Sequence, residues 1–137
     1  MSKTYIPASL RALVGDRANH ACEYCLIPEI AVFSSLEIDH IIAEKHGGQT
    51  VSENLALACS LCNKYKGSDL ASIDPETEEI TRLFNPRQDD WQHHFQLKND
   101  GEIQPQTSIG RVTTKLLRIN DSGRIKERAL LQQAKVL

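Results

Sequence analysis

Four cysteines carry the clearest chemical signal in the sequence. They form two pairs, Cys22 with Cys25 and Cys59 with Cys62, and each pair has two residues between its members. Four thiolates in two such pairs can surround one ion tetrahedrally, as they do in closed structural zinc sites. The pattern predicts a zinc knuckle. The loop between the pairs is longer than the roughly 15 to 20 residues of the simplest zinc ribbons, so the ion must close a loop that holds a whole supersecondary unit.

Accidental spacing and a pair of disulfide bonds are the alternatives to a zinc site. A disulfide between cysteines two residues apart closes a tight, strained loop. The sequence shows no secretory segment and no apolar run long enough to span a membrane. We therefore expect a cytoplasmic protein with reduced cysteines, in which zinc is the favoured interpretation.

The enclosed segment contains polar residues that could do chemistry. Asp39 and His40 adjoin within it, Asn54 follows, and Asn63 comes directly after the last cysteine. Branched aliphatic residues at 36–42 predict a short strand with Asp39 and His40 near its end. Asn63 can lie close to Asp39 and His40 only if further elements of secondary structure fold it back toward this strand.

The residues that follow supply that element. Gly47-Gly48 predicts a loop over 45–52, and the apolar residues at 55–59 predict a second strand. A helix is expected from Ser60, its N-cap, to about Leu70. The order strand, loop, strand, helix allows Asp39, His40 and Asn63 to converge in one cleft.

This segment resembles the HNH endonucleases. The resemblance covers roughly residues 21–67 and is carried by the following stretches: Cys22-Glu23-Tyr24-Cys25, Ile38-Asp39-His40-Ile41, Gly47-Gly48, Glu53-Asn54-Leu55 and Cys59-Ser60-Leu61-Cys62-Asn63-Lys64-Tyr65-Lys66-Gly67. Asn63 stands where the family name expects His, as in the HNN variant of the family. Residues 83–95 resemble the C-terminal extension of small stand-alone bacterial and cyanobacterial members more weakly.

The resemblance implies an α+β fold with a ββα-metal core, a four-cysteine zinc knuckle, an N-terminal helix and a C-terminal extension of a hairpin and helices. It implies that Asp39 and Asn63 hold one catalytic divalent cation, Mg²⁺ or Mn²⁺, which suits oxygen ligands. His40 would be the general base. Asn54 would tie the loop between the strands and orient His40. The implied reaction is hydrolysis of DNA, with double-stranded DNA as the expected substrate.

Several residues have a second interpretation. Asn63 could be only a first-turn helix residue that caps backbone groups. Lys64, Lys66 and Arg87 are candidate phosphate contacts, and His46 is either such a contact or an exposed loop residue. The alternative for the whole chain is a zinc-knuckle module that binds nucleic acid without cutting it.

Composition neither requires nor excludes a nucleic-acid substrate. The chain has 137 residues and a net charge of -2. Acidic residues predominate over 69–90 and basic residues over 111–137, so a local basic face is compatible with the acidic total. Arg111, Lys115 and Arg118 are spaced to share one helix face, which is either a phosphate contact or a solvated surface.

The flanking segments predict a domain organisation. We expect a zinc-stabilised core over 1–70 and an extension over 71–137 packed on it. Within the core, a first helix is predicted over 7–17, where it would cover the zinc knuckle. Within the extension we expect a strand or helix end at 80–84, a short helix at 89–95 and a hairpin around Asn99-Asp100-Gly101, then helices over 108–119 and 124–136.

Overall fold

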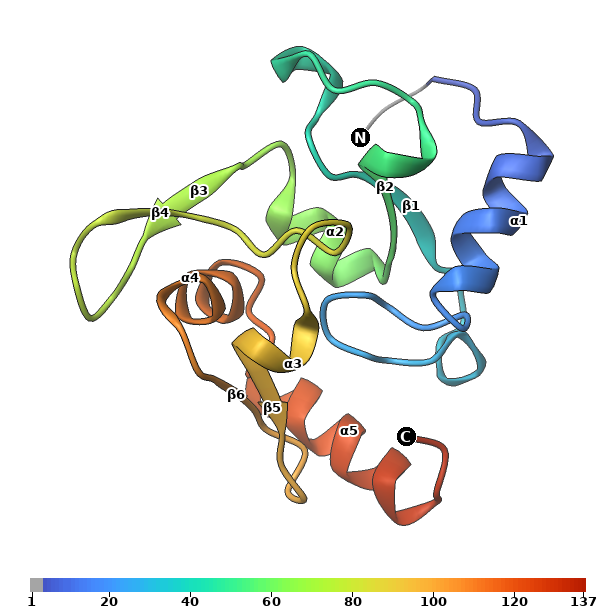
Figure 1. Ribbon diagram of the computed structural model, residues 1–137. Coiled ribbons are helices and arrows are strands. Elements are labelled where there is room, and N and C mark those ends of the chain that lie inside the picture. Colours follow the sequence, from blue (N-terminus) through green and yellow to red (C-terminus); the bar gives the residue numbers. More distant parts are fainter. Residues whose placement is uncertain (1–3) are drawn as a thin grey trace. The chain divides into compact units, whose positions relative to one another are not determined.

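The computed structural model describes residues 4–137 and divides the chain into two compact units. The first unit ends at Asp69, and the second is Leu70–Leu137. The fold is α+β, with three separate two-stranded antiparallel sheets and the rest of the ordered chain in helices (Figure 1). No helix among the described residues combines the length and the apolar character needed to cross a bilayer.

The first unit consists of a β-hairpin between two helices (Figure 1). Its regular elements are α1 (Ala8–Arg17), β1 (Glu37–His40), β2 (Leu55–Ala58) and α2 (Ser60–Lys66), and its single-turn 3₁₀ helices are η1 (Glu29–Ala31), η2 (Glu44–His46) and η3 (Ser52–Asn54). The predicted strand, loop, strand, helix order is therefore confirmed.

The pairing of β1 with β2 decides which side chains share a face. Glu37 lies opposite Ala58 and Asp39 lies opposite Ala56. Because side chains alternate along a strand, these four residues occupy one face of the hairpin. The small alanines leave room there for side chains from α2, which contacts β1.

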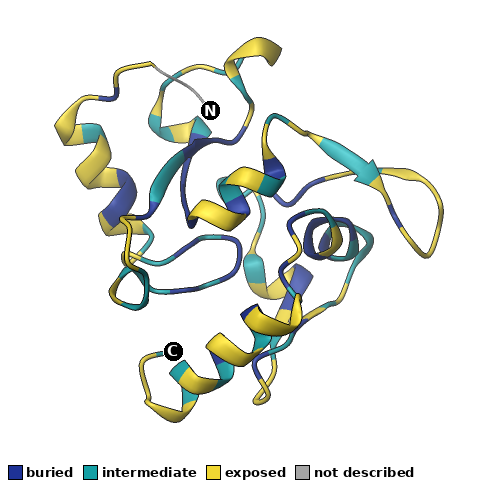
Figure 2. Cartoon of the chain, turned by 180° about the vertical axis from the view of Figure 1, so that it is seen from behind, coloured by how far each residue is buried: buried dark blue, intermediate teal, exposed yellow. Residues whose placement is uncertain are grey.

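The other flanking helix, α1, contacts β2 and η3. Arg17, in its last turn, donates hydrogen bonds to the carbonyl oxygens of Ser52 and Leu55. The helix thus holds the end of the loop and the start of β2. That it also covers the zinc knuckle stays a prediction. Figure 2 shows β2 fully buried and much of α1 exposed.

The start of α2 differs from the prediction. Its N-cap is Cys59, whose sulfur accepts a hydrogen bond from the Cys62 amide, and Ser60 is the first helical residue. The helix ends at Lys66 because Gly67 adopts a positive φ of 52°, a conformation that costs glycine least. A helix reaching Leu70 was therefore too long a prediction.

The second unit is built from two hairpins and three helices. They are β3 (Ala71–Ile73), β4 (Ile80–Arg82), α3 (Trp91–His94), β5 (Phe95–Leu97), β6 (Ile103–Pro105), α4 (Ser108–Leu116) and α5 (Ser122–Gln133). The hairpin at Asn99-Asp100-Gly101 is confirmed, but β3 was missed because its alternation covers only three residues, too few to distinguish a strand from a loop. The rings of Trp91 and Phe95 lie 5.1 Å apart, as expected for a packing pair.

A buried ion pair joins the β3–β4 turn to α4. Both Asp74 carboxylate oxygens accept hydrogen bonds from Arg111, at 3.0 and 2.8 Å. They also accept from the Glu76 amide and the Thr77 hydroxyl. These hydrogen bonds, that from Arg111 above all, hold the pKa of the Asp74 carboxyl well below its usual range. The Arg111 guanidinium is thus bound to Asp74 within this unit, so neither alternative from the sequence, a phosphate contact or a solvated face, describes it.

This ion pair predicts acid-sensitive stability of the second unit. A carboxyl whose pKa is lowered by folding contributes stability that is complete above its unfolded pKa, about 3.9. The contribution is lost as the pH falls through the folded value. We expect the free energy of unfolding of wild type to drop between about pH 5 and pH 2 more steeply than that of Asp74→Asn. Trp91 is the only tryptophan of the chain, so its fluorescence reports the melting of this unit.

The control for this measurement is Asp121→Asn, which removes an exposed carboxylate at the start of α5. It should retain the wild-type acid dependence. Parallel stability curves for wild type and Asp74→Asn across this range would contradict the assignment.

Candidate active site and metal centre

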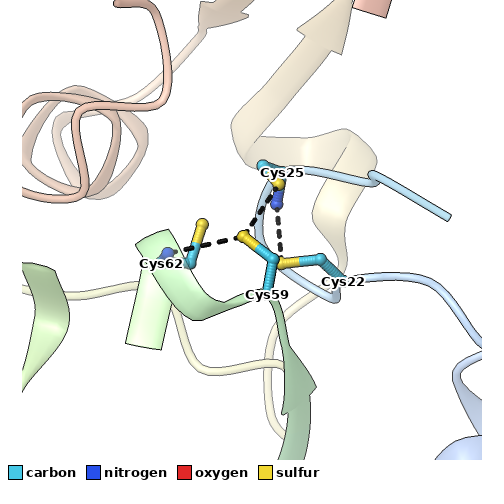
Figure 3. Close-up of side chains that lie close together, drawn as sticks. All are labelled: Cys22, Cys25, Cys59 and Cys62. Carbon is cyan, nitrogen blue, oxygen red and sulfur yellow. Dashed lines mark hydrogen bonds between the residues drawn. The ribbon is translucent and has the colours of Figure 1, made fainter. Parts of the chain in front are cut away.

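The four cysteines converge on one centre in the first unit (Figure 3). All four are buried, and their sulfur atoms lie within 4.8 Å of one another. The Cys25 amide donates to the Cys22 sulfur and the Cys62 amide donates to the Cys59 sulfur, each at 3.4 Å. Each pair therefore presents its two sulfurs from a tight turn, with the Cys59 pair at the start of α2.

The spacing of the sulfurs fits a zinc ion. Zinc–sulfur bonds of about 2.3 Å in a tetrahedron place neighbouring sulfurs about 3.8 Å apart. The sulfurs of Cys25 and Cys59 lie 3.6 Å apart. Four buried thiol groups, two from each side of the enclosed segment, are thus positioned to form a closed structural zinc site, which would link the knuckle to the hairpin and α2.

Asp39 lies beside this centre, in the interior of the unit. It is 4% exposed. Its Oδ2 accepts a hydrogen bond from the Tyr24 hydroxyl at 2.8 Å, and the Lys66 ammonium group lies 3.2 Å from Oδ1 and 3.1 Å from Oδ2. Burial raises the pKa of the Asp39 carboxyl, while the charge of Lys66 and the hydrogen bonds from Tyr24 and Lys66 act in the opposite direction. The carboxylate therefore connects the zinc knuckle, β1 and α2.

Lys66 has a different place from the one expected. Its side chain is 2% exposed, and its ammonium group also donates to the carbonyl oxygens of His40 and Ile41. The expected surface contact between Lys66 and nucleic acid is therefore corrected, because the three protons of a buried ammonium group are used by internal acceptors. Lys66 instead fixes the end of β1 to α2.

His40 is the last residue of β1 and is buried. Its Nε2 lies 2.9 Å from the Thr50 hydroxyl. When Nε2 carries the proton and donates it to that hydroxyl, Nδ1 keeps its lone pair and can accept another proton. Thr50 is therefore the side chain that orients the ring, a role for which the sequence analysis named Asn54.

Asn54 clamps the backbone of the loop instead. Its Oδ1 accepts from the Ile42 amide, and its Nδ2 donates to the carbonyl oxygens of Ile42 and Gln49. This closes the loop over Gly48, where any side chain would collide with the Ile42 carbonyl. The predicted tie between Asn54 and the loop is thus present in the structure, and it holds both ends of the segment that carries Thr50.

Asn63 lies on α2 one turn before Lys66 and faces β1. Its Nδ2 donates to Oε2 of Glu37 at 3.4 Å, and both residues are partly exposed. The same side of β1 therefore presents Glu37 toward Asn63 and Asp39 toward Lys66. The Asn63 contact joins two side chains, so the residue does more than cap the helix.

The oxygen donors on this side fit a hard divalent cation in type. They are the carboxylates of Glu37 and Asp39 and the amide oxygen of Asn63, and such ligands suit Mg²⁺ or Mn²⁺. A carboxylate offers about four acceptor positions. Tyr24 donates one hydrogen bond to Oδ2 of Asp39 and Lys66 donates one to Oδ1, so about two positions are left for a cation.

The other candidate nucleic-acid contacts are dispersed. Lys64 is exposed, with its ammonium group 5.6 Å from the centre of the Tyr65 ring. His46 is exposed, and its Nε2 contacts the Ser68 carbonyl oxygen at 3.1 Å. Arg87 belongs to the second unit, and its role as a phosphate clamp stays a prediction. Of these candidates, Lys64 combines an exposed charge with a position next to Asn63.

Sequence reasoning missed four contributors to this site: Tyr24, Glu37, Thr50 and Lys66 in its internal role. Glu37 carried a usable signal, since it lies two residues before Asp39 and strand alternation places both on one face. Tyr24, Thr50 and Lys66 gave none, because their contacts join segments far apart in the sequence.

The fold and the site define a ββα module with a four-cysteine cluster that fits zinc and a histidine at the end of its first strand. Residues 22–69 match the family described as HNH endonuclease. Residues 22–69 therefore carry an HNH endonuclease domain, which indicates a nuclease-family function related to nucleic acid. No curated protein and no solved structure matches the chain significantly.

Proposed function

We propose that the protein is a metal-dependent endonuclease that hydrolyses DNA phosphodiester bonds. The observation that carries the proposal is the placement of His40 at the end of β1, with the Thr50 hydroxyl on its Nε2 and with the preceding residue, Asp39, bound to Lys66 of α2. The match of residues 22–69 to the HNH endonuclease family supports the same reaction class.

In this mechanism His40 is the general base. Nδ1 takes a proton from the attacking water, and Thr50 keeps the opposite nitrogen protonated. The water oxygen forms a bond to phosphorus as the bond from phosphorus to the 3′ oxygen breaks. The leaving oxygen takes a proton from solvent, so the products are a 5′-phosphate and a 3′-hydroxyl. Imidazole suits this role because it exchanges protons near neutral pH.

Asp39 and Asn63 would hold one Mg²⁺ or Mn²⁺ ion. When bound, that ion supplies Lewis-acid stabilisation of charge on the phosphate and the leaving oxygen. Lys66 and Tyr24 hold the Asp39 carboxylate in place, and Asn54 holds the loop that carries Thr50. The first unit thus brings the base and the oxygen ligands to one short strand and the helix beside it.

A plasmid assay tests the proposal. Purified zinc-loaded protein is incubated with supercoiled double-stranded plasmid and either Mg²⁺ or Mn²⁺. We expect nicked or linear product that is absent without the divalent cation. Binding of the plasmid without cleavage under every condition would instead support a zinc-knuckle module that binds nucleic acid and does not cut it.

A further inference from the structure

Glu37 places a carboxylate directly against the Asn63 side chain, and the mechanism above gives it no role. Its Oε2 lies 3.4 Å from the Asn63 side-chain amide nitrogen. The two ends of an asparagine amide exchange places when the group turns by 180°. After that turn the Asn63 oxygen would lie about as far from Glu37 as two neighbouring oxygens lie around one octahedral Mg²⁺ ion, roughly 3.0 Å.

The net charge around the proposed cation favours a second carboxylate ligand. Asp39 and Lys66 form a buried ion pair, so their charges cancel, and Asn63 is neutral. Without Glu37, the proposed ligands Asp39 and Asn63 together with Lys66 would carry no net negative charge. Affinity for a divalent cation depends strongly on the charge of its ligands. Glu37 contributes the missing charge from the same face of β1.

The carboxylates of Asp39 and Glu37 also differ in their exposure to solvent. Asp39 is buried and already accepts two hydrogen bonds, from Tyr24 and Lys66. Glu37 is partly exposed, so its carboxylate can exchange the Asn63 contact for a cation that arrives from solvent. We propose that Glu37 is a ligand of the catalytic divalent cation, beside Asn63. This inference rests on the proposed function, because it concerns the cation that the nuclease would use.

Binding of Mn²⁺ alone tests the assignment without measuring activity. Zinc-loaded full-length protein is titrated with Mn²⁺, and free Mn²⁺ is followed by electron paramagnetic resonance. We expect wild type to bind one Mn²⁺ ion, and Glu37→Gln to bind it at least about tenfold more weakly, because a charged ligand becomes neutral. Asn63→Ala should show a comparable loss if both residues serve one site.

The matched control is Glu53→Gln, which neutralises an exposed glutamate of the same unit whose carboxylate accepts a hydrogen bond from the neighbouring Ser52 hydroxyl. It should bind Mn²⁺ as wild type does. Glu37→Asp provides a second variant that keeps the charge, and it should recover part of the affinity. Melting curves and zinc content identify any variant that has lost its fold.

Two results would overturn the assignment, and they are distinguishable. Unchanged Mn²⁺ affinity in folded Glu37→Gln would show that Glu37 only orients the Asn63 amide, while the proposed nuclease function would stand. Absence of Mn²⁺ binding by wild type, also with a DNA duplex present, would remove both the assignment and the cation on which the proposed function depends.

Discussion

The His40→Ala variant should lose cleavage by about 10²- to 10⁴-fold, the range that a positioned general base contributes. This corresponds to roughly 3 to 5 kcal/mol of the activation barrier. The reason is local: His40 is the only histidine within strands β1 and β2, both of which the structure describes in full, and its Nε2 is held by Thr50. The rate of plasmid nicking by purified protein in Mg²⁺ measures the effect.

Binding of DNA should survive this substitution, because the base acts on water rather than on the backbone of the substrate. Duplex binding in the absence of divalent cation checks this point. His20→Ala is the control, since His20 lies just before the knuckle, about half exposed, with Asp16 as a neighbour. Cleavage by folded His40→Ala at the wild-type rate would remove His40 from the mechanism.

Removal of zinc should unfold the first unit. A core in so short a chain segment rarely contributes more than about 3 to 5 kcal/mol, whereas structural zinc contributes about 10 to 16 kcal/mol of apparent binding energy in small peptides. The cysteine pairs hold the knuckle to the start of α2, and Tyr24 extends that link to Asp39. Hydrogen exchange at the amides of β1 and α2 should become fast after chelation and slow again when zinc is restored.

The Cys59→Ser variant tests the same point without a chelator. It removes one sulfur of the site and also alters the N-cap of α2. Serine is itself a favoured N-cap residue, so the loss of stability should come from the missing sulfur, and Cys59→Ser should approach the instability of the chelated protein. A chelator already saturated with zinc is the control for direct effects of the reagent. Slow exchange at β1 and α2 in protein that has lost its zinc would contradict a structural role for the metal.

The short-range organisation of the first unit was predictable from the sequence. Branched aliphatic residues predicted β1, Gly47-Gly48 predicted the loop, and the spacing of the cysteines predicted their convergence on one centre. These signals are local, because they depend on backbone preference and on residues a few positions apart. The same reasoning placed Asp39 and His40 at the end of the strand.

The boundaries of the helices and strands were less predictable where tertiary contacts compete with local preference. Ser60 is a good N-cap by composition, yet Cys59 takes the position because its sulfur faces the metal centre and the Cys62 amide. In the second unit the short strand β3 exists because it pairs with β4, with Ser72 opposite Thr81. A strand of three residues is too short for its pairing to be recognised from the sequence.

The roles of charged residues depended most on tertiary structure. Lysine and arginine usually lie on the protein surface, but the fold places Lys66 against Asp39 and Arg111 against Asp74. Arg128 is likewise buried, donating to the carbonyl oxygens of Gly101 and Ile119. Sequence spacing shows which residues share a face of a helix or strand. It does not show which element packs against that face, and that element determines whether a charged side chain is solvated or paired with a buried carboxylate.

The sequence by itself determined the four-cysteine cluster, the hairpin that carries Asp39 and His40, and the helix that carries Asn63. Only the tertiary structure decided that Asp39 is held by Lys66 and Tyr24, that Thr50 contacts the His40 ring, and that Glu37 faces Asn63. The physical reason is distance along the chain: each of these contacts joins segments that are at least ten residues apart, and they become neighbours only when the strands pair and α2 packs on β1.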